Sequence, residues 1–377
     1  MRFQFLAALT AATALVLAGC ATVPAAPPAG PGASVRPLPS AATPPAPPPG
    51  VVSVGVSADF ARLPGWADDD HAAALAAFQA GCPAARDMEL AIVCRRALAL
   101  GHVGEARARR FLETNFRPEA VAEPGLLTAY FSPVYEARAR REGPFTAPVR
   151  PRPDDLPMDD WAVGQGALYA DRAVIEARPA KDALAWMRPE DLFFLQVQGS
   201  GVLVYPDGAR VKALFDGVNG ARFHGIAAPM REQGLLADDN TSGEAIRAWL
   251  ARHQGAEADA VMRLNPRYVF FRLAPDDGLD PAGAAGEPLI PGRAVAVDLS
   301  KHSLGEMFWI DASAPALAGA FPTYRRLTIA LDTGGAIKGD ARADLYLGRG
   351  PEAGLAAGRV RHVLRLYRLA PVTTPSS

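Results

Sequence analysis

Two aspartates near the carboxyl end of the chain flank a glycine-rich turn. The segment LDTGGAIKGDARADLYLGRG contains Asp332 and Asp344, with two adjacent glycines and a single lysine, Lys338, between them. A carboxyl group can act as a general acid when burial or a like-charged neighbour raises its pKa toward the working pH, whereas a nearby cation lowers that pKa. Asp332 would raise the pKa of Asp344, and Lys338 would lower it. The motif alone leaves open whether the aspartates do acid–base chemistry or only cap the turns.

Other common catalytic schemes lack their residues here. The six histidines form no HxxxH pattern and the cysteines form no CxxC, so the sequence predicts no zinc site. The GSG at residues 199–201 has neither the GxSxG spacing of a serine nucleophile nor the GxGxxG of a dinucleotide loop. GGAIKGD also lacks the GK[ST] ending of a phosphate loop. Carboxylate chemistry remains, and we predict no metal and no cofactor.

Strand patterns dominate the regions around these motifs. GRAVAVDLS, EMFWIDAS and RLTIALD lie in the last hundred residues, which we expect to be all β. Residues 193–217 read as strand, glycine turn, strand, Pro-Asp-Gly turn and strand. The segment LLTAYFSPVY reads as a strand that ends at Pro133. A further aromatic strand over residues 268–271 is expected to contribute core side chains.

The region from Trp66 to Phe116 has helical periodicity. Three consecutive aspartates, residues 68–70, supply an acidic first turn, and apolar residues recur after them at i, i+3 and i+7 from Leu75. Another helix is expected over residues 243–252. We interpret the first of these regions as an accessory helical part with no chemistry of its own.

The first twenty residues, MRFQFLAALTAATALVLAGC, carry an early arginine, a short apolar core and a small-residue ending. This pattern is typical of a secretory signal, predicted here as residues 1–19, rather than of a membrane span. The last four of these residues, LAGC, resemble the bacterial lipobox, so we expect Cys20 to be lipidated and to anchor the mature chain. Residues 20–55 are rich in proline and alanine and would form an extended spacer. Residues 371–377 are expected to be a disordered tail.

Export would place the two remaining cysteines, Cys82 and Cys94, in an oxidising compartment. Pairing is the default there, so we expect a disulfide between them. The alternative is two separate buried thiols.

The bulk composition predicts a globular protein. The chain has 377 residues, of which 49% are hydrophobic, and a formal net charge of −1. Neither a nucleic-acid partner nor an anionic surface is indicated by so small a charge.

Six motifs resemble those of a known family in the same order. They are GLLTAYFSPVYEA, LYADRAVIE, FFLQVQGSG, NPRYVFFR, PLIPGRAVAVD and LDTGGAIKGDARADLYLG, which span most of the chain after the spacer. Together they resemble membrane-bound lytic murein transglycosylase A, a family of peptidoglycan-cleaving lipoproteins of Gram-negative bacteria. The three aspartates of the family's C-terminal domain match Asp298, Asp332 and Asp344.

Two motifs depart from the family's pattern. Residues 303–305 read SLG where the family has PLG, and residues 215–220 read FDGVNG where it has YAGxNG. Neither change touches the three aspartates, but Asp216 would alter one saccharide subsite.

The resemblance implies a mainly β fold with accessory helices, in the α+β class. A double-psi β-barrel would be assembled from residues 56–137, with the N-terminal helices, and residues 264–370. A smaller β-barrel would be inserted as residues 138–263. The glycan would lie in the groove between the two domains, where concave ligand sites are common.

The reaction that the resemblance implies is cleavage of the β-1,4 bond between N-acetylmuramic acid and N-acetylglucosamine without water. The sugar's own C6 hydroxyl would be the nucleophile, giving a 1,6-anhydromuramoyl end, as an exo-acting carbon–oxygen lyase would. Asp344 would be the single acid and base, with Asp332 beside it in the catalytic site.

Ten further residues are expected to bind or approach the glycan. Thr128, Tyr130, Gln198 and Ser200 would hydrogen-bond sugar hydroxyl and acetamido groups, and the glycines would let the backbone come close. Lys338 would either contact a ligand carboxylate or only complete the turn. The set consists of Thr128, Tyr130, Gln198, Gly199, Ser200, Gly201, Asp298, Gly334, Gly335 and Lys338.

The resemblance and the lipobox imply an outer-membrane lipoprotein that faces the periplasm, because Ala21 rather than an aspartate follows the lipidated cysteine. Its partners would be peptidoglycan glycan strands and, through the lipid anchor, the outer membrane. Other cell-wall enzymes are candidate partners.

Two other functions stay open from the residues. The first is a hydrolase that uses Asp332 and Asp344 as the two carboxylates of an ordinary glycosidase. The second is a lipoprotein that grips peptidoglycan without cleaving it. The products formed from murein distinguish the lyase from both.

Overall fold

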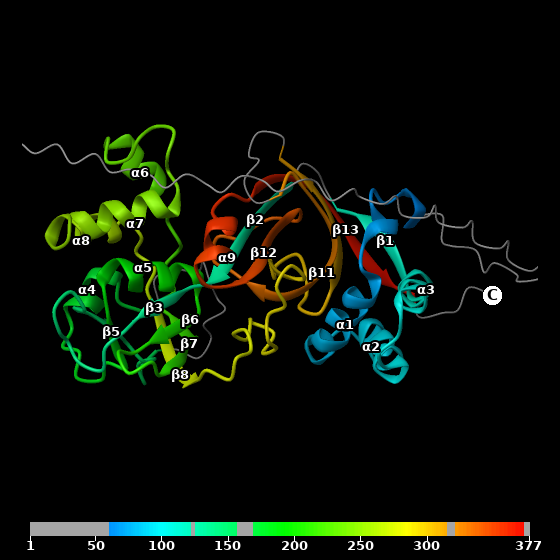
Figure 1. The fold of residues 1–377 in the computed structure, drawn as a ribbon, viewed down its shortest axis with the longest axis horizontal. Helices are drawn as coiled ribbons and strands as arrows, with labels where there is room; N and C mark the ends of the chain where they lie inside the picture. Colours follow the sequence, from blue (N-terminus) through cyan, green and yellow to red (C-terminus); the bar gives the residue numbers. More distant parts are fainter. Residues whose placement is uncertain (1–59, 122–124, 157–168, 315–320, 373–377) are drawn as a thin grey trace, which may run out of the picture. The chain divides into compact units, whose positions relative to one another are not determined.

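The computed structural model describes residues 60–121, 125–156, 169–314 and 321–372, all within one compact unit, Ser53–Ser377 (Figure 1). The predicted signal peptide, the lipidation site Cys20 and the spacer lie outside the described residues, as do residues 373–377 of the predicted tail. Among the helices of the described residues, none is long and apolar enough to cross a membrane.

Three helices form where the helical periodicity predicted them: α1 (His71–Gly81), α2 (Met88–Leu100) and α3 (Glu105–Asn115). Asp70 caps α1 by accepting a hydrogen bond from the N–H of Ala73 at 2.9 Å. Short 3-10 turns flank α1 at η1 (Phe60–Arg62), η2 (Trp66–Asp68) and η3 (Cys82–Ala84).

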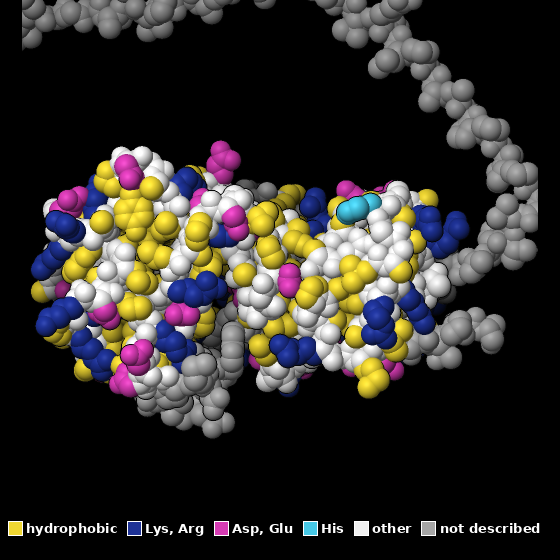
Figure 2. All heavy atoms as spheres, turned by 90° about the horizontal axis from the view of Figure 1, so that it is seen from below, with side chains coloured by type: hydrophobic (Ala, Val, Ile, Leu, Met, Phe, Trp, Pro, Cys, Tyr) yellow, Lys and Arg dark blue, Asp and Glu magenta, His cyan; other side chains and the backbone are white. Residues whose placement is uncertain are grey.

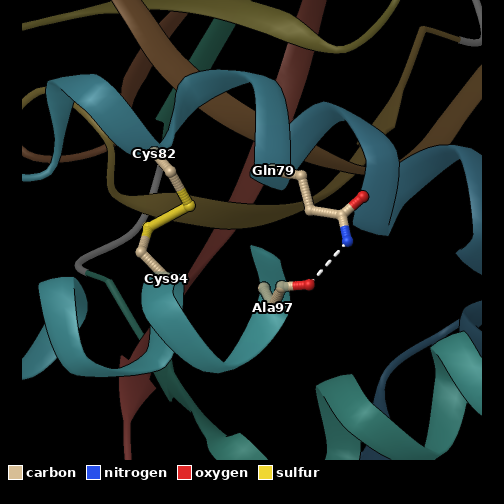
Figure 3. The surroundings of a disulfide bond; sticks show 4 residues. All are labelled: Gln79, Cys82, Cys94 and Ala97. Carbon is tan, nitrogen blue, oxygen red and sulfur yellow. Dashed lines mark hydrogen bonds between the residues drawn. A yellow bond between two sulfur atoms is a disulfide. The ribbon is translucent and has the colours of Figure 1, made fainter. Parts of the chain in front are cut away.

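A disulfide joins the end of α1 to α2 (Figure 3). It links Cys82 and Cys94, whose Cα atoms are 5.5 Å apart, and it is the pairing that the sequence analysis expected. Close by, the side-chain amide of Gln79 donates to the carbonyl of Ala97 at 2.7 Å. The two helices are therefore fixed to each other at two neighbouring points.

Six strands close into a barrel. Their hydrogen-bonded order is β13-β10-β11-β9-β12-β2, and β2 pairs back with β13. The β11–β9 and β12–β2 pairs are parallel and the other pairs are antiparallel, while β1 (Phe116–Ala120) adds to β13 outside the ring. The six strands are β2 (Gly125–Ser132), β9 (Ala294–Val297), β10 (Met307–Ser313), β11 (Thr323–Thr333), β12 (Arg342–Arg349) and β13 (Arg361–Pro371).

The inner and outer faces of this barrel bury different clusters. Side chains from all six strands, including Ala343 and Leu345 of β12, form one apolar cluster inside the ring. Successive side chains of a strand point to opposite faces, so Asp344 and Tyr346 point outward. On that outer face Tyr346 joins a second cluster, made with residues of α1, α2 and α3 such as Phe78.

A second set of strands forms a smaller ring. One sheet has the order β3-β6-β7-β8, and β4 pairs with β5. Arg138, just after β3, exchanges hydrogen bonds with Trp186 on β5, and Phe271 on β8 donates to the carbonyl of Arg150, just after β4. These links close the ring around its own apolar cluster. Its strands are β3 (Val134–Glu136), β4 (Ala147–Val149), β5 (Ala185–Met187), β6 (Gly201–Val204), β7 (Arg210–Val218) and β8 (Val269–Pro275).

The predicted fold class is therefore confirmed: the protein is α+β, with a closed barrel and additional sheets. The predicted strands at the start of the C-terminal region are β9, β10 and β11, and the aromatic residues Tyr268, Phe270 and Phe271 are buried as expected. Strands β3 and β8 both hydrogen-bond into the smaller ring.

Within the described residues, five helices belong to the stretch of chain that carries the smaller ring. One of them coincides with the predicted helix over residues 243–252. They are α4 (Arg172–Ala177), α5 (Pro189–Gln198), α6 (Ala227–Glu232), α7 (Gly243–Arg252) and α8 (Ala256–Met262).

One strand prediction is wrong, because residues 193–198 form the second half of α5. Pro189 stands in the first turn of this helix and is followed by Glu190 and Asp191, which favour a helix N-terminus. Gly199 ends the helix in the left-handed conformation, with φ 85°. These start and stop signals outweigh the aromatic and β-branched residues between them. The two strands predicted after it are present as β6 and β7.

The last hundred residues are also not all β. Helix α9 (Gly350–Ala357) lies between β12 and β13 and packs on β2 and β12. Its sequence GPEAGLAA places a proline in the first turn, as helix starts often do.

Charged side chains are mixed on the face drawn in Figure 2. Lys and Arg are interspersed with Asp and Glu there, and no large patch of one sign stands out on that face. This agrees with the small net charge of the sequence.

Candidate active site

The two aspartates of the glycine-rich motif lie on the strands that flank β9. Asp332 on β11 and Asp344 on β12 are both in register with Ala296 on β9. Directly opposed residues of neighbouring strands share one face of a sheet. Both carboxyl groups therefore belong to the outer face of the barrel, with Cα atoms two strand spacings, or about 10 Å, apart. Ala296 places only a methyl group between them.

Asp344 is reached by a two-step chain of hydrogen bonds. Arg342 donates from Nη2 to Oγ1 of Thr128 at 2.8 Å, and the Thr128 hydroxyl bonds to Oδ1 of Asp344. A guanidinium can only donate hydrogen bonds, so the Thr128 hydroxyl accepts a hydrogen bond from Arg342 and donates one to Asp344. Burial raises the pKa of Asp344 above its ordinary value, although the Thr128 bond and the charge of Arg342 act in the opposite direction.

Asp332 is held by three donors of the protein. The Tyr130 hydroxyl donates to its Oδ2 at 2.7 Å, and the N–H groups of Ala284 and Thr333 donate to its Oδ1 at 3.0 and 2.9 Å. Burial raises the pKa of Asp332 despite these bonds, and the charge of Asp344 adds to the rise. Burial and Asp332 together raise the pKa of Tyr130 well above its ordinary value, so Tyr130 stays a donor.

Asp298 fixes the turn that follows the glycines. It is 3% exposed, and its carboxylate accepts from the N–H of Gly339 at 2.8 Å and from both the N–H and the hydroxyl of Ser300. Burial alone would raise the pKa of Asp298, but these hydrogen bonds and Lys338 outweigh it and lower the pKa to about 2. His302 adds a second restraint by donating from Nε2 to the carbonyl of Asp340 at 2.7 Å.

The expected effect of Lys338 on the catalytic pair is corrected by this geometry. Lys338 lies 3.5 Å from Asp298, and neither Lys338 nor Asp332 is among the groups that shift the pKa of Asp344, although both were expected to shift it. The cation beside Asp344 is Arg342 instead. Lys338 lies between Asp332 and Asp344 in the sequence, but the turn places its side chain beside Asp298.

The QGSG segment meets β2 just beyond Tyr130. Oε1 of Gln198 accepts from the N–H of Phe131 at 3.2 Å, and a Cβ added at Gly201 would lie 2.8 Å from the carbonyl oxygen of Pro133. The Ser200 hydroxyl accepts from the N–H of Phe215 at 3.4 Å. The segment thus lies beside the strand that carries Thr128 and Tyr130, but it makes no hydrogen bond to the aspartates within the described residues.

The double glycine forms a tight turn after β11. The N–H of Ile337 donates to the carbonyl of Gly334 at 3.0 Å. A Cβ added at Gly335 would lie 3.0 Å from Nη1 of Arg267, which is tighter than an ordinary contact, so a larger residue there would require the guanidinium to shift.

Arg342 was not predicted to lie in this site. The signal was available in the triplet Arg342-Ala343-Asp344, because side chains two apart on a strand share a face. The backbone donor of Ala284 had no such signal, since a main-chain N–H is the same in every residue but proline.

No group of three histidine, cysteine or carboxylate side chains that could hold a metal ion occurs in the part of the chain that the structure describes.

Comparison with known proteins identifies the family. The model of the MltA specific insert domain matches residues 126–272, and that of the 3D domain matches residues 293–370. Membrane-bound lytic murein transglycosylase A of Vibrio cholerae is 34% identical over 259 residues, which cover 67% of each chain.

Solved structures show the same likeness. A membrane-bound lytic murein transglycosylase from Agrobacterium tumefaciens aligns with a TM-score of 0.72 and 34% identity, over 83% of this chain and 96% of that one. Escherichia coli MltA with bound chitohexaose aligns with a TM-score of 0.64 and 27% identity, over 80% and 90%. The chain therefore belongs to the membrane-bound lytic murein transglycosylase A family.

Proposed function

We propose that this protein is a lytic transglycosylase that cleaves peptidoglycan glycan strands at the bond between N-acetylmuramic acid and N-acetylglucosamine. Its family members are named as lytic murein transglycosylases, and one of them binds chitohexaose. The proposed products carry 1,6-anhydromuramic acid ends.

The observation that carries the proposal is the unequal engagement of the two aspartates. Both oxygens of Asp332 accept hydrogen bonds from the protein. Asp344 receives one bond, on Oδ1, and its Oδ2 has no donor among the described residues. One carboxyl group is therefore free to exchange a proton with a ligand, and the other is committed to holding Tyr130 and the neighbouring backbone.

This arrangement suits a reaction with one acid. Protonated Asp344 would give its Oδ2 proton to the glycosidic oxygen as the bond to C1 breaks. The resulting carboxylate would then take the proton of the C6 hydroxyl as C6 oxygen bonds to C1, which restores the acid. A glycosidase with two acting carboxylates needs the second to attack or to activate water, and Asp332 is occupied by three donors.

The sugar-binding roles follow from position. Thr128 and Tyr130 lie on the strand next to Asp344, and we propose that they, with Gln198, Ser200, Asp298 and Lys338, line or support the glycan path. Gly199, Gly201, Gly334 and Gly335 would let backbone groups approach it. We also propose the two-domain division of the sequence analysis, with the boundary strands β3 and β8 assigned to the inserted domain because they pair with β6 and β7.

Digestion of purified murein sacculi followed by mass analysis tests the function. We expect muropeptides with anhydro ends, each lighter by one water than a hydrolysed reducing end. Reducing ends would identify a two-carboxylate hydrolase instead. Binding to sacculi without any soluble product would identify a non-catalytic binding protein.

Replacing Arg342 with glutamine is expected to move the alkaline limb of the pH profile to higher pH. The positive charge of Arg342 favours the ionised form of Asp344 and so lowers its pKa. Removing the charge raises that pKa, and the acid then stays protonated to higher pH. The measurement is kcat/KM on soluble glycan as a function of pH, because the limbs of that profile report the essential acid and base of the free enzyme.

Arg107→Gln on α3 is the matched control, because it removes one positive charge from an exposed side chain that is not among the groups acting on the pKa of Asp344. Its profile should overlay that of the parent protein. If the alkaline limb of Arg342→Gln shifts to lower pH or does not move, Arg342 does not lower the pKa of the catalytic acid.

The family is membrane-bound, which indicates a protein of the cell envelope. We propose that the attachment is a lipid at Cys20 and that the protein faces the periplasm from the outer membrane. Cys20→Ser should move the protein to the soluble periplasmic fraction while its activity on isolated murein stays the same. Retention of the variant in the outer-membrane fraction would contradict the lipid anchor.

A further inference from the structure

Arg267 places a guanidinium group against the double-glycine turn without a partner in the protein. Its Nη1 is buried and has no hydrogen-bond partner. Within the described residues the Arg267 side chain forms no ion pair or hydrogen bond, and no neighbouring charge offsets its burial. Nε and Nη2 also form no hydrogen bond within the described residues, but unlike Nη1 they are not fully buried, so the edge that they form is open to a ligand.

The backbone that carries Arg267 is held firmly. Asn219 donates from Nδ2 to the carbonyl of Pro266 at 2.9 Å, and Arg172 donates to the carbonyls of Asn265, at 2.8 Å, and of Arg267. Both Asn219 and Arg172 are buried. The guanidinium is therefore presented from a fixed segment rather than from a free loop.

The turn on the other side is adapted to this arginine. A Cβ added at Gly335 would lie 3.0 Å from Nη1 and 3.2 Å from Cζ of Arg267, which is tighter than ordinary contact. Gly335 is three residues after Asp332 and nine before Asp344. The charge of nearby Lys338 is paired with Asp298, so it does not duplicate that of Arg267.

A buried cation without a partner costs free energy, and proteins usually pair such a group. A guanidinium edge with two parallel N–H groups matches the two oxygens of a carboxylate. Peptidoglycan carries carboxylates, whereas chitin oligosaccharides carry none.

We propose that Arg267 forms an anion subsite beside the catalytic turn and binds a carboxylate of the peptidoglycan substrate. The proposal rests on the proposed function for the identity of the glycan. The carboxylate has two possible sources: the lactyl group of a muramoyl residue without its peptide, or the peptide stem itself. In peptide-bearing glycan the lactyl group is an amide and only the stem carboxylates remain.

Titration calorimetry of Arg267→Gln tests the subsite in an Asp344→Asn background, in which no turnover is needed. The ligands are chitohexaose, murein glycan freed of peptides by an amidase, and soluble peptide-bearing glycan. We expect binding of at least one carboxylate-bearing ligand to weaken about tenfold or more, as for a lost hydrogen bond to a charged group. The affinity of Arg267→Gln for chitohexaose should stay within about twofold of that of its parent. The carboxylate-bearing ligand whose affinity falls identifies whether the lactyl group or the peptide stem binds Arg267.

Arg107→Gln in the same background is the control for net charge and should leave all three affinities unchanged. Equal weakening for chitohexaose, or no weakening for any ligand, overturns the proposal. Arg267→Gln should also melt at or above the temperature of its parent, because no hydrogen bond or ion pair to the protein is lost. A large fall in melting temperature would make Arg267 structural and would also overturn it. Reducing ends among the products of murein digestion would contradict the transglycosylase function. The binding measurements would still show whether Arg267 binds a carboxylate.

Discussion

Replacing Asp344 with asparagine is expected to lower turnover of murein by about 10²–10⁴-fold, the usual contribution of a general acid or base. Asparagine keeps the shape of the side chain and can still accept from Thr128 through its amide oxygen. It has no proton to give to the glycosidic oxygen and cannot take one from the C6 hydroxyl. The measurement is the initial rate of anhydromuropeptide release from sacculi, with glycan binding measured in parallel.

The matched variant is Asp332→Asn, which changes the other carboxyl group of the same face in the same way. It loses part of the hydrogen-bonding set with Tyr130, Ala284 and Thr333. We expect a smaller loss of rate together with a measurable loss of stability, because this residue organises the site rather than transferring protons. An Asp344→Asn protein that forms anhydro ends at the parental rate would contradict the catalytic assignment.

Local patterns predicted much of the fold. The i, i+3, i+7 spacing identified the N-terminal helices, and short strand-like segments identified β9, β10 and β11. The missed helix α5 shows the limit of composition: FFLQVQ contains residues that favour strands, yet the proline and acids before it and Gly199 after it set its ends. Giving those boundary signals more weight than the residues between them would have corrected the prediction.

The contacts of the site were less accessible from the sequence. Thr128 and Asp344 are 216 residues apart, and their hydrogen bond depends on the parallel pairing of β2 with β12. No local pattern specifies which two strands pair. The family resemblance indicated which residues to consider, but only the registers show that Asp332 and Asp344 both face outward beside Ala296.

The three acidic residues before α1 illustrate the same limit. Their spacing in the sequence predicted one acidic first turn. In the structure Asp70 caps the helix, while Asp69 turns to the barrel and binds Arg293 through two hydrogen bonds of 2.8 Å each. A residue 224 positions away determines the role of Asp69.

Replacing Arg293 with methionine is expected to destabilise the protein by about 3–5 kcal/mol, the usual cost of leaving one partner of a buried ion pair unpaired. Arg293 and Asp69 are 5% and 8% exposed. Arg293 also donates to the carbonyls of Leu327 and Asp70, and Asp69 accepts from the N–H of Leu327. The pair thus joins the start of α1 to β11 and, through Arg293 itself, to the start of β9. The measurement is the free energy of unfolding in urea, compared at an unchanged m-value.

A double variant, Asp69→Leu with Arg293→Met, separates the ion pair from simple loss of contacts. Removing both charges leaves no unpaired ion, so the double variant should lose less stability than the sum of the two single variants. Arg107→Gln, which removes an exposed charge from α3, should stay within about 0.5 kcal/mol of the parent. A loss below about 1 kcal/mol for Arg293→Met, or additive effects in the double variant, would contradict the role given to this pair. Because β9 begins at Ala294 and carries Ala296 between the two aspartates, we expect Arg293→Met to lower activity only at temperatures or urea concentrations that begin to unfold the protein.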